Sequence, residues 1–282
     1  MTDYHFANQV ALVTGGGRGL GQAFAVALAQ AGETVVLVAR SEAQLQDVCQ
    51  AIQQAGGRAL AFAADVTDRQ AIEGIVAEVE QRLGDIDLLV NSAGVLRALG
   101  PIAEVDPDDW WREIEINVRG TFLVARAVLP GMLARQHGRI INMASVAGLQ
   151  ALPAGSAYCL SKAAVIRFTE NLALDHGEQG VRAFAVHPGD VRNAMLNYVA
   201  ESDEVKQRAP IVQGWVQQMY QAGEDTPIDR SVELIMLLAS GKADVLSGRY
   251  IDVHVDLNAL LQQSDTIERD DLYTLRLRTP KE

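Results

Sequence analysis

Short runs of β-branched and aliphatic residues alternate with longer helical stretches along almost the whole chain. Apolar runs of four to eight residues between turn signals indicate buried strands, whereas an apolar face that repeats every 3.6 residues indicates a helix. Strand, helix and strand in succession require crossover connections, which give parallel strands covered by helices. The alternation therefore predicts an α/β, doubly wound fold with a mostly parallel sheet and helices on both faces.

Thirteen elements follow from this pattern. Strands are predicted at 10–15, 34–39, 58–64, 86–91, 138–145, 181–189 and 248–256. Helices are predicted at 20–32, 41–56, 67–84, 106–133, 156–177 and 230–240. Ser41 and Thr67 are expected as N-caps, and Pro130 is expected to disturb the helix in which it lies. No repeat or Pro/Gly-rich linker divides the sequence, so residues 1–282 are expected to form one domain.

Two segments depart from the alternation. Residues 190–228 are long for a connection and carry apolar residues at helical spacing, which predicts either a lid over a substrate site or an ordinary surface helical hairpin. Residues 257–282 form a C-terminal extension. The alternating apolar residues of 265–282 indicate a segment that reaches another subunit or one that is frayed.

Charge and hydropathy exclude several functions. A formal net charge of −12 argues against nucleic acid as a partner, because binding a phosphate backbone requires clustered Lys and Arg. No apolar run approaches the roughly 18 residues that span a bilayer, so no membrane span is expected. The N-terminus lacks a signal-peptide pattern, and two distant cysteines make no disulfide framework. A cytoplasmic protein is expected.

A glycine-rich turn, VTGGGRGLG at 13–21, joins the first strand to the first helix. Glycines permit the tight turn and a close approach to a pyrophosphate, and the helix N-terminus presents unpaired N–H groups. In this strand–helix context the turn predicts dinucleotide binding and a Rossmann-type fold.

The end of the second strand indicates which dinucleotide binds. An acidic residue at this place usually holds the ribose 2′-hydroxyl of NAD, whereas the sequence reads Ala39-Arg40. Arg40 and Arg18 can contact a 2′-phosphate, so NADP(H) is preferred. Glu42 is close enough to keep NAD(H) as an alternative.

Tyr158 and Lys162 lie four residues apart in a chain with 6 Tyr and only four Lys. On a helix these positions share one face. An ammonium group near a phenol, together with the positive nicotinamide of an oxidised cofactor, lowers the phenol pKa, which makes Tyr158 a usable general acid/base.

The motifs TGGGRGLG, NSAG (91–94), INVRG (116–120), Ser145, YCLSK (158–162) and HPGDV (187–191) occur in one order. Together they resemble the short-chain dehydrogenase/reductase family in its single-domain branch, from about residue 8 to about 255. The resemblance implies a catalytic tetrad. Tyr158 would exchange a proton with the substrate oxygen, and Lys162 would lower the pKa of Tyr158 and hold the nicotinamide ribose. Ser145 would polarise the carbonyl, and Asn117 would position a proton-relay water.

The resemblance also implies the cofactor contacts. The expected residues are Gly15, Gly17, Arg18, Gly19, Leu20, Gly21, Arg40, Asp65, Val66, Asn91, Ala93, Gly94, Tyr158, Lys162, Pro188, Gly189, Val191 and Asn193. Asn193 stands where the family often has Thr, and Ser92 stands where it often has Asn. The family ending VDGG reads VDLN at 255–258.

Function is therefore expected to be hydride transfer between NADP(H) and a carbonyl or secondary alcohol. Its alternatives are an NAD(H)-preferring dehydrogenase of the same family and a cofactor-binding regulator without catalysis. An epimerase or dehydratase on this fold generally needs a longer chain. The resemblance further suggests a homo-oligomer, dimer or tetramer, with 106–133 and 156–177 as the interface helices.

The substrate lining is expected to be mostly apolar, which suggests a ketone or alcohol of some bulk. The candidate lining residues are Leu96, Leu149, Leu152, Met195, Leu196 and Trp215. His187 and His254 have no ligand partner at metal spacing on one helix face, so they are expected to be structural histidines. No catalytic metal is predicted.

Overall fold

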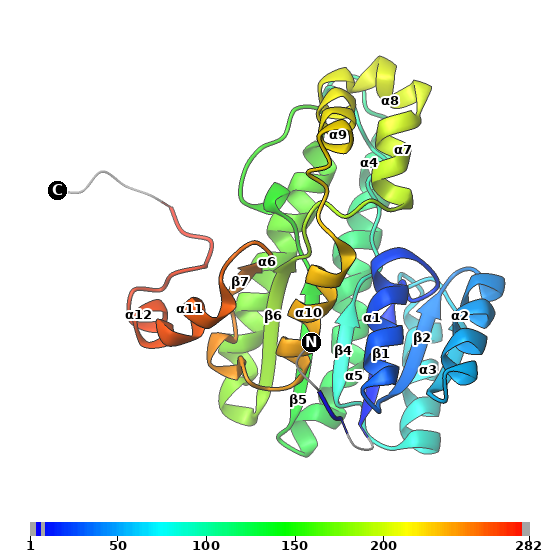
Figure 1. Ribbon diagram of the computed structural model, residues 1–282, viewed down its shortest axis with the longest axis vertical. Helices are drawn as coiled ribbons and strands as arrows, with labels where there is room; N and C mark the ends of the chain where they lie inside the picture. The colour runs from blue at the N-terminus through cyan, green and yellow to red at the C-terminus, as the bar shows by residue number, and fades with distance from the viewer. Residues whose placement is uncertain (1–3, 7–8, 278–282) are drawn as a thin grey trace.

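A single seven-stranded parallel sheet, covered by helices on both faces, forms the body of the protein (Figure 1). The computed structural model describes residues 4–6 and 9–277. The strand order is β3-β2-β1-β4-β5-β6-β7, in which the direction of winding reverses between β1 and β4. The doubly wound fold predicted from the sequence is confirmed, and all neighbouring strands are parallel.

The strands are close to the predicted ranges, except that the last is much shorter. They are β1 Val10–Thr14, β2 Thr34–Ala39, β3 Arg58–Ala63, β4 Leu88–Asn91, β5 Gly138–Met143, β6 Val181–His187 and β7 Tyr250–Asp252.

The helices between them are α1 Gly19–Gln30, α2 Glu42–Gln54, α3 Arg69–Leu83, α4 Pro107–Ile114, α5 Thr121–Ala134, α6 Ser156–His176 and α10 Ile228–Ala239. Three further helices lie between β6 and α10, and two follow β7. They are α7 Ala194–Glu201, α8 Asp203–Arg208, α9 Pro210–Ala222, α11 Leu257–Gln262 and α12 Ser264–Arg269.

Each strand contributes alternate side chains to two apolar layers, because successive residues of a strand point to opposite faces. In β1, Ala11 and Val13 pack with α1, α2 and α10, whereas Val10 and Leu12 pack with α3 and α5. Both faces of the sheet are therefore buried, which explains why its strands read as continuous apolar runs.

Local details correct two expectations. Ser41 caps α2 as predicted, but the N-cap of α3 is Asp68, whose carboxylate accepts from Ala71 N, and not Thr67. Thr67 instead donates to Asp65. Pro130 lies inside α5 without ending it, and the irregularity falls at a π-helical turn, Glu115–Gly120, between α4 and α5. Such turns are frequent at functional sites.

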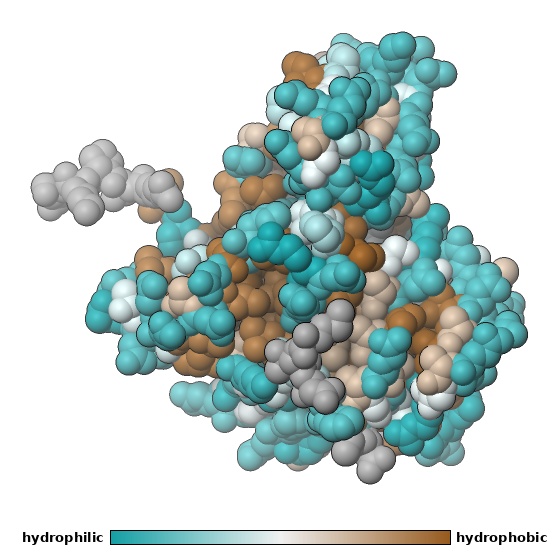
Figure 2. Space-filling view, in the orientation of Figure 1, coloured by the Kyte–Doolittle hydropathy of each residue, from teal (hydrophilic) through white to brown (hydrophobic). Residues whose placement is uncertain are grey.

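The segment 190–228 folds as three short helices rather than a two-helix hairpin. α7, α8 and α9 stand above the carboxyl ends of the strands as a separate upper lobe (Figure 1). Their inner sides form an apolar cluster that includes Val199, Val205, Val216 and Leu99. The outer side of the lobe seen in Figure 2 is mainly hydrophilic.

The described part of the C-terminal extension packs on its own chain. Tyr250 N donates to Tyr273 O at 2.8 Å, and Arg276 pairs with the buried Glu170 at 2.8 Å. Contact of residues 265–277 with another subunit stays a prediction, and residues 278–282 lie outside the described range. Phe122 and Leu160 are exposed on α5 and α6. Subunit contact through these helices stays a prediction. Within residues 4–6 and 9–277, no helix is long and apolar enough to cross a membrane.

Candidate active site

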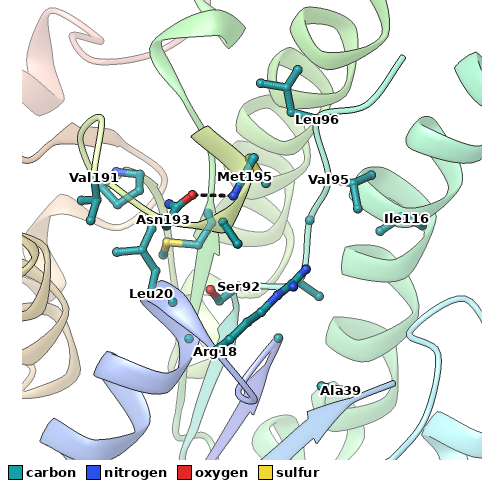
Figure 3. A pocket seen from close by; sticks show the side chains of 18 of the residues that line it. Arg18, Leu20, Ala39, Ser92, Val95, Leu96, Ile116, Val191, Asn193 and Met195 are labelled. Atoms are coloured by element: carbon teal, nitrogen blue, oxygen red, sulfur yellow. Dashed lines mark hydrogen bonds between the residues drawn. The ribbon is translucent and has the colours of Figure 1, made fainter. Parts of the chain in front are cut away.

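A cavity of about 430 Å³ opens at the carboxyl ends of the strands, beside the point where the strand order reverses. Ligands of doubly wound sheets bind at this place because adjacent crossover loops diverge there. The lining comes from the loops after β1, β2, β3, β4, β5 and β6 and from α6 and α7 (Figure 3).

Most of the cofactor residues expected from the sequence line this cavity. They are Gly15, Gly17, Arg18, Gly19, Leu20, Gly21, Arg40, Asp65, Val66, Ala93, Gly94, Tyr158, Lys162, Pro188, Gly189, Val191 and Asn193. Asn91 is the exception. It is buried beneath the cavity, where its Nδ2 donates to Asn142 Oδ1 at 2.9 Å.

The turn after β1 has the geometry that its glycines allow. Gly15 has a φ of +67°, which favours glycine, and a Cβ on Gly21 would lie 2.4 Å from Gly15 O. α1 begins at Gly19, and no side chain caps its N-terminus among the described residues. Its first N–H groups therefore fit a pyrophosphate at this end of the cavity.

Arg18 and Arg40 are exposed and line the same end of the cavity, and neither forms an ion pair within the described residues. Ser41 and Gln44 also line it. Glu42, which the sequence left as a ribose partner, is not among the lining residues. Two guanidinium groups without an ion-pair partner among the described residues therefore line this end of the cavity.

Asp65 is held by its neighbours. Its Oδ1 accepts from Thr67 N at 2.9 Å, and its Oδ2 pairs with Arg112 at 2.7 Å. Burial acts to raise the pKa of Asp65, but these hydrogen bonds and the Arg112 charge outweigh it and hold the pKa below its usual range. The carboxylate is therefore ionised and fixed at the cavity wall.

Tyr158 and Ser145 lie together at the other end of the cavity. Ser145 follows β5 and Tyr158 lies in the first turn of α6, where the Ser145 side chain hydrogen-bonds with the Tyr158 hydroxyl. Burial raises the pKa of Tyr158 above its ordinary value, and the hydrogen bond with Ser145 opposes this only in part. The neutral form of the phenol is thus favoured here. The phenolate that the sequence predicts is not favoured by this chain's own residues.

Lys162 lies one turn further along α6, with Nζ 5.5 Å from the centre of the Tyr158 ring. Its Nζ donates to Met143 O at 2.7 Å. Burial lowers the pKa of Lys162 to about 8, and the charge of Glu113 opposes that shift. Helical spacing places Tyr158 and Lys162 in one site, as predicted.

Glu113 is a buried carboxylate that sequence reasoning missed. Its Oε2 accepts from Arg97 N at 2.6 Å and from Ala98 N at 2.9 Å, while Oε1 has no hydrogen-bond partner among the described residues. Burial raises the pKa of Glu113. The residue fixes the loop after β4, and no motif in the sequence marked it.

Asn117 lies in the π-helical turn and does not line the cavity. Its Oδ1 accepts from Val95 N at 2.8 Å, and its Nδ2 donates to Val95 O at 2.9 Å and to Ser161 Oγ at 3.1 Å. A Cβ on Gly94 would contact both Asn117 Oδ1 and Lys162 Nζ. Asn117 therefore adjoins Lys162, but its amide is occupied with the Val95 backbone.

The substrate end is only partly as expected. Leu96, Met195 and Leu196 line the cavity, whereas Leu149, Leu152 and Trp215 do not. Leu149 and Trp215 are 49% and 48% exposed. Trp215 lies on α9, and helical spacing alone does not fix which side of a helix faces a cavity. The residues that sequence reasoning missed on this side include Val95, Arg97, Ile116, His187 and Asp190.

Asn193 ends the loop after β6 and caps α7. Its Oδ1 accepts from Met195 N at 2.9 Å (Figure 3) and from Leu196 N at 3.1 Å. Capping leaves the Nδ2 group for a ligand in the cavity. Asn193 thus fixes the start of the upper lobe at the edge of the site.

Comparison with known proteins agrees with this arrangement. The sequence model of the short chain dehydrogenase family matches residues 9–204. A short chain dehydrogenase of Pseudocercospora fijiensis is 34% identical over 278 residues, which cover 95% of this chain and 89% of the relative.

Two solved structures superpose well. NAD⁺-bound xylitol dehydrogenase has a TM-score of 0.80 and 31% identity, covering 88% of this chain and 98% of the other. A gluconate 5-dehydrogenase from Burkholderia cenocepacia J2315, in complex with NADP and tartrate, has a TM-score of 0.79 and 30% identity, covering 93% and 98%.

The fold and the cavity thus define an NAD(P)-dependent oxidoreductase. The chain belongs to the short-chain dehydrogenase/reductase family, as the motifs in its sequence indicate.

Proposed function

We propose that this protein interconverts a carbonyl compound and a secondary alcohol with NADP(H), and that Tyr158 handles the proton. The observation that carries the proposal is the partly buried phenol of Tyr158, which lines the cavity with Ser145 bonded to its hydroxyl and Lys162 beside it. When bound, the nicotinamide donates or accepts the hydride.

The chain's own residues supply the rest. In reduction, the neutral Tyr158 hydroxyl donates its proton to the substrate oxygen, and Ser145 hydrogen-bonds that oxygen. Lys162 stabilises the resulting phenolate by its charge. Asn117 acts as a positioning residue, because it holds Val95 and adjoins Lys162.

NADP(H) is favoured by charge. Arg18 and Arg40 offer two unpaired guanidinium groups at the cofactor end of the cavity, and Glu42 stands outside the lining. Guanidinium groups recognise a phosphate with paired hydrogen bonds. The alternative is NAD(H), which the xylitol dehydrogenase structure contains.

The substrate is proposed to be a largely apolar ketone or alcohol, because Leu96, Met195 and Leu196 line the cavity beside the upper lobe. Two similar structures are named for a polyol and a sugar acid, so the fold itself does not select apolar substrates. The proposal of an apolar substrate therefore depends on the apolar side chains that line this cavity.

The first test is Tyr158→Phe. This substitution keeps the ring and removes the hydroxyl, so turnover should fall by about 10²–10⁴-fold while cofactor affinity changes little. Initial rates over a carbonyl and alcohol panel, together with the quenching of intrinsic fluorescence by NADPH, measure both quantities. Retained turnover would contradict the role of Tyr158.

The cofactor test is Arg40→Ala. Loss of a guanidinium–phosphate contact should raise KM for NADPH by about tenfold and leave KM for NADH within about twofold. Arg58→Ala, at an exposed arginine on β3 outside the cavity, is the matched control. Equal effects on both cofactors would favour the NAD(H) alternative.

A further inference from the structure

Two histidines and an aspartate meet at the carboxyl ends of β6 and β7. His187, Asp252 and His254 each offer one possible ligand atom, and these three atoms lie within 4.8 Å of one another. The sheet register places His187 opposite Asp252. His254 follows two residues later, and its backbone N–H donates to Asp252 Oδ1 at 2.9 Å.

The ring nitrogens of His187 and His254, which could serve as metal ligands, make few hydrogen bonds. His187 is only 4% exposed, and its Nδ1 has no hydrogen-bond partner among the described residues. His254 is exposed, and Nε2 of its ring lies 3.3 Å from Thr226 Oγ1. A buried ring nitrogen without a partner loses its hydration and gains nothing in return, which is unfavourable unless a ligand binds there.

The carboxylates at this place also have no Lys or Arg ion-pair partner among the described residues. Asp190 is partly buried and lies close enough to Asp252, His187 and His254 to interact electrostatically with all three. Neither Asp190 nor Asp252 forms an ion pair with Lys or Arg among residues 4–6 and 9–277. Two carboxylates beside two imidazoles form a site that favours a cation.

We propose that His187, Asp252 and His254 bind a divalent transition-metal ion of the zinc type, with water in the remaining position. Two imidazoles and one carboxylate suit Zn²⁺, Co²⁺ or Ni²⁺, whereas Mg²⁺ and Ca²⁺ prefer oxygen ligands. Bonds of about 2.0–2.2 Å in a tetrahedron separate ligand atoms by roughly 3.4 Å. The three side chains must therefore draw slightly closer, and the exposed His254 can do so once its contact with Thr226 Oγ1 is given up.

The proposed metal site borders the cavity but does not include Tyr158. His187 and Asp190 line the cavity, whereas Asp252 and His254 do not. A bound ion would tie β6 to the segment after β7, at a place where β7 has only three residues and one neighbouring strand. The expected effect is on stability, and it does not depend on the proposed hydride transfer.

The test uses the full chain without a polyhistidine tag, freed of metal by a chelator. Titration with Co²⁺ should give the visible absorption of a low-symmetry site at one ion per chain, and Zn²⁺ should displace it. Zn²⁺, but not Mg²⁺, should raise the melting temperature. A wild-type chain that binds no stoichiometric Co²⁺ or Zn²⁺ would overturn the proposal.

Variants assign the ion to these residues. His254→Ala and Asp252→Asn should each weaken Zn²⁺ binding, measured by calorimetry, at least about tenfold, since even outer-shell losses cost this much. His176→Ala removes a partly exposed histidine that contacts Gln179 and should leave binding unchanged. His254 is a surface residue, so its variant should fold, which circular dichroism checks. Equal affinity in His254→Ala and the wild type would place the ion elsewhere and overturn the assignment.

Discussion

Tyr158 and Lys162 lie in surroundings that favour the neutral form of both side chains. Burial raises the pKa of Tyr158 and lowers that of Lys162 to about 8, because desolvation disfavours any charge. Glu113 interacts with both and opposes ionisation of the phenol while supporting the ammonium ion. A single buried carboxylate therefore influences both groups of the proposed proton transfer.

Glu113→Gln tests this influence. Gln can still accept from Arg97 N and Ala98 N, but it carries no negative charge. Without that charge the pKa of Lys162 falls further. The ammonium ion is present only below its pKa, so the high-pH decline of kcat/KM should move to lower pH.

The measurement is a pH profile of kcat/KM for wild type and variant. Glu115→Gln is the matched control, because Glu115 pairs with Arg112 near the surface two residues away. A profile displaced toward higher pH, or equal shifts in both variants, would contradict an electrostatic role for Glu113.

At the scale of elements, α4 and the π-helical turn fix the loop that follows β4. Glu113 and Asn117 are four residues apart, and both bind backbone groups of residues 95–98. The same loop meets the upper lobe, because the Arg97 guanidinium lies 3.6 Å from the centre of the Tyr198 ring on α7. A continuous set of contacts thus links α4 to the helices above the cavity.

Tyr198→Leu should loosen that contact. A cation–π pair near the surface contributes about 0.5–1 kcal/mol, so substrate KM should rise by about two- to fivefold with little change in kcat. Tyr198 does not line the cavity, and an effect on KM would therefore act through the position of α7.

Glu204→Gln is the control for Tyr198→Leu. It removes the charge that pairs with the Tyr198 hydroxyl, 3.0 Å away, and with Arg208, and it keeps the ring. Steady-state kinetics on the best substrate compare the two. An unchanged KM in Tyr198→Leu would show that the position of α7 does not depend on the Arg97–Tyr198 contact.

At the scale of the whole molecule, the C-terminal segment closes one edge of the body. Glu170 on α6 is buried, and it accepts from Leu275 N at 2.8 Å and pairs with Arg276. Arg249 beside β7 pairs with Asp271 at 2.8 Å. The contacts of Glu170 join residues about one hundred positions apart in the chain.

Removing residues 271–282 should lower the melting temperature by about 2–6 °C. The truncation removes hydrogen bonds to a buried charge, which lowers the free energy of unfolding by about 1–3 kcal/mol. For a chain of this size, each kcal/mol corresponds to roughly 2 °C in melting temperature. A chain that ends at Leu277 keeps the described contacts and is the control. Calorimetry that finds equal melting temperatures for the two chains would contradict the structural role of the segment.

The sequence alone determined the strands, most of the helices, the glycine turn and the pairing of Tyr158 with Lys162. These depend on local periodicity and on spacing within one element, which a linear pattern records. Its errors had the same origin. Leu149 and Trp215 are apolar but do not line the cavity, and Asn91 has its amide turned to Asn142.

Only the tertiary structure decided which residues of different helices and strands lie close together. Glu113 approaches Lys162 because α4 packs against α6, and His187 meets Asp252 and His254 because two parallel strands end at the same level. Ligand spacing along one helix face does not reveal that group, since His187 and Asp252 end neighbouring strands and are more than sixty residues apart in the chain. Side-chain neighbours of this kind depend on register and packing, which the order of residues does not state.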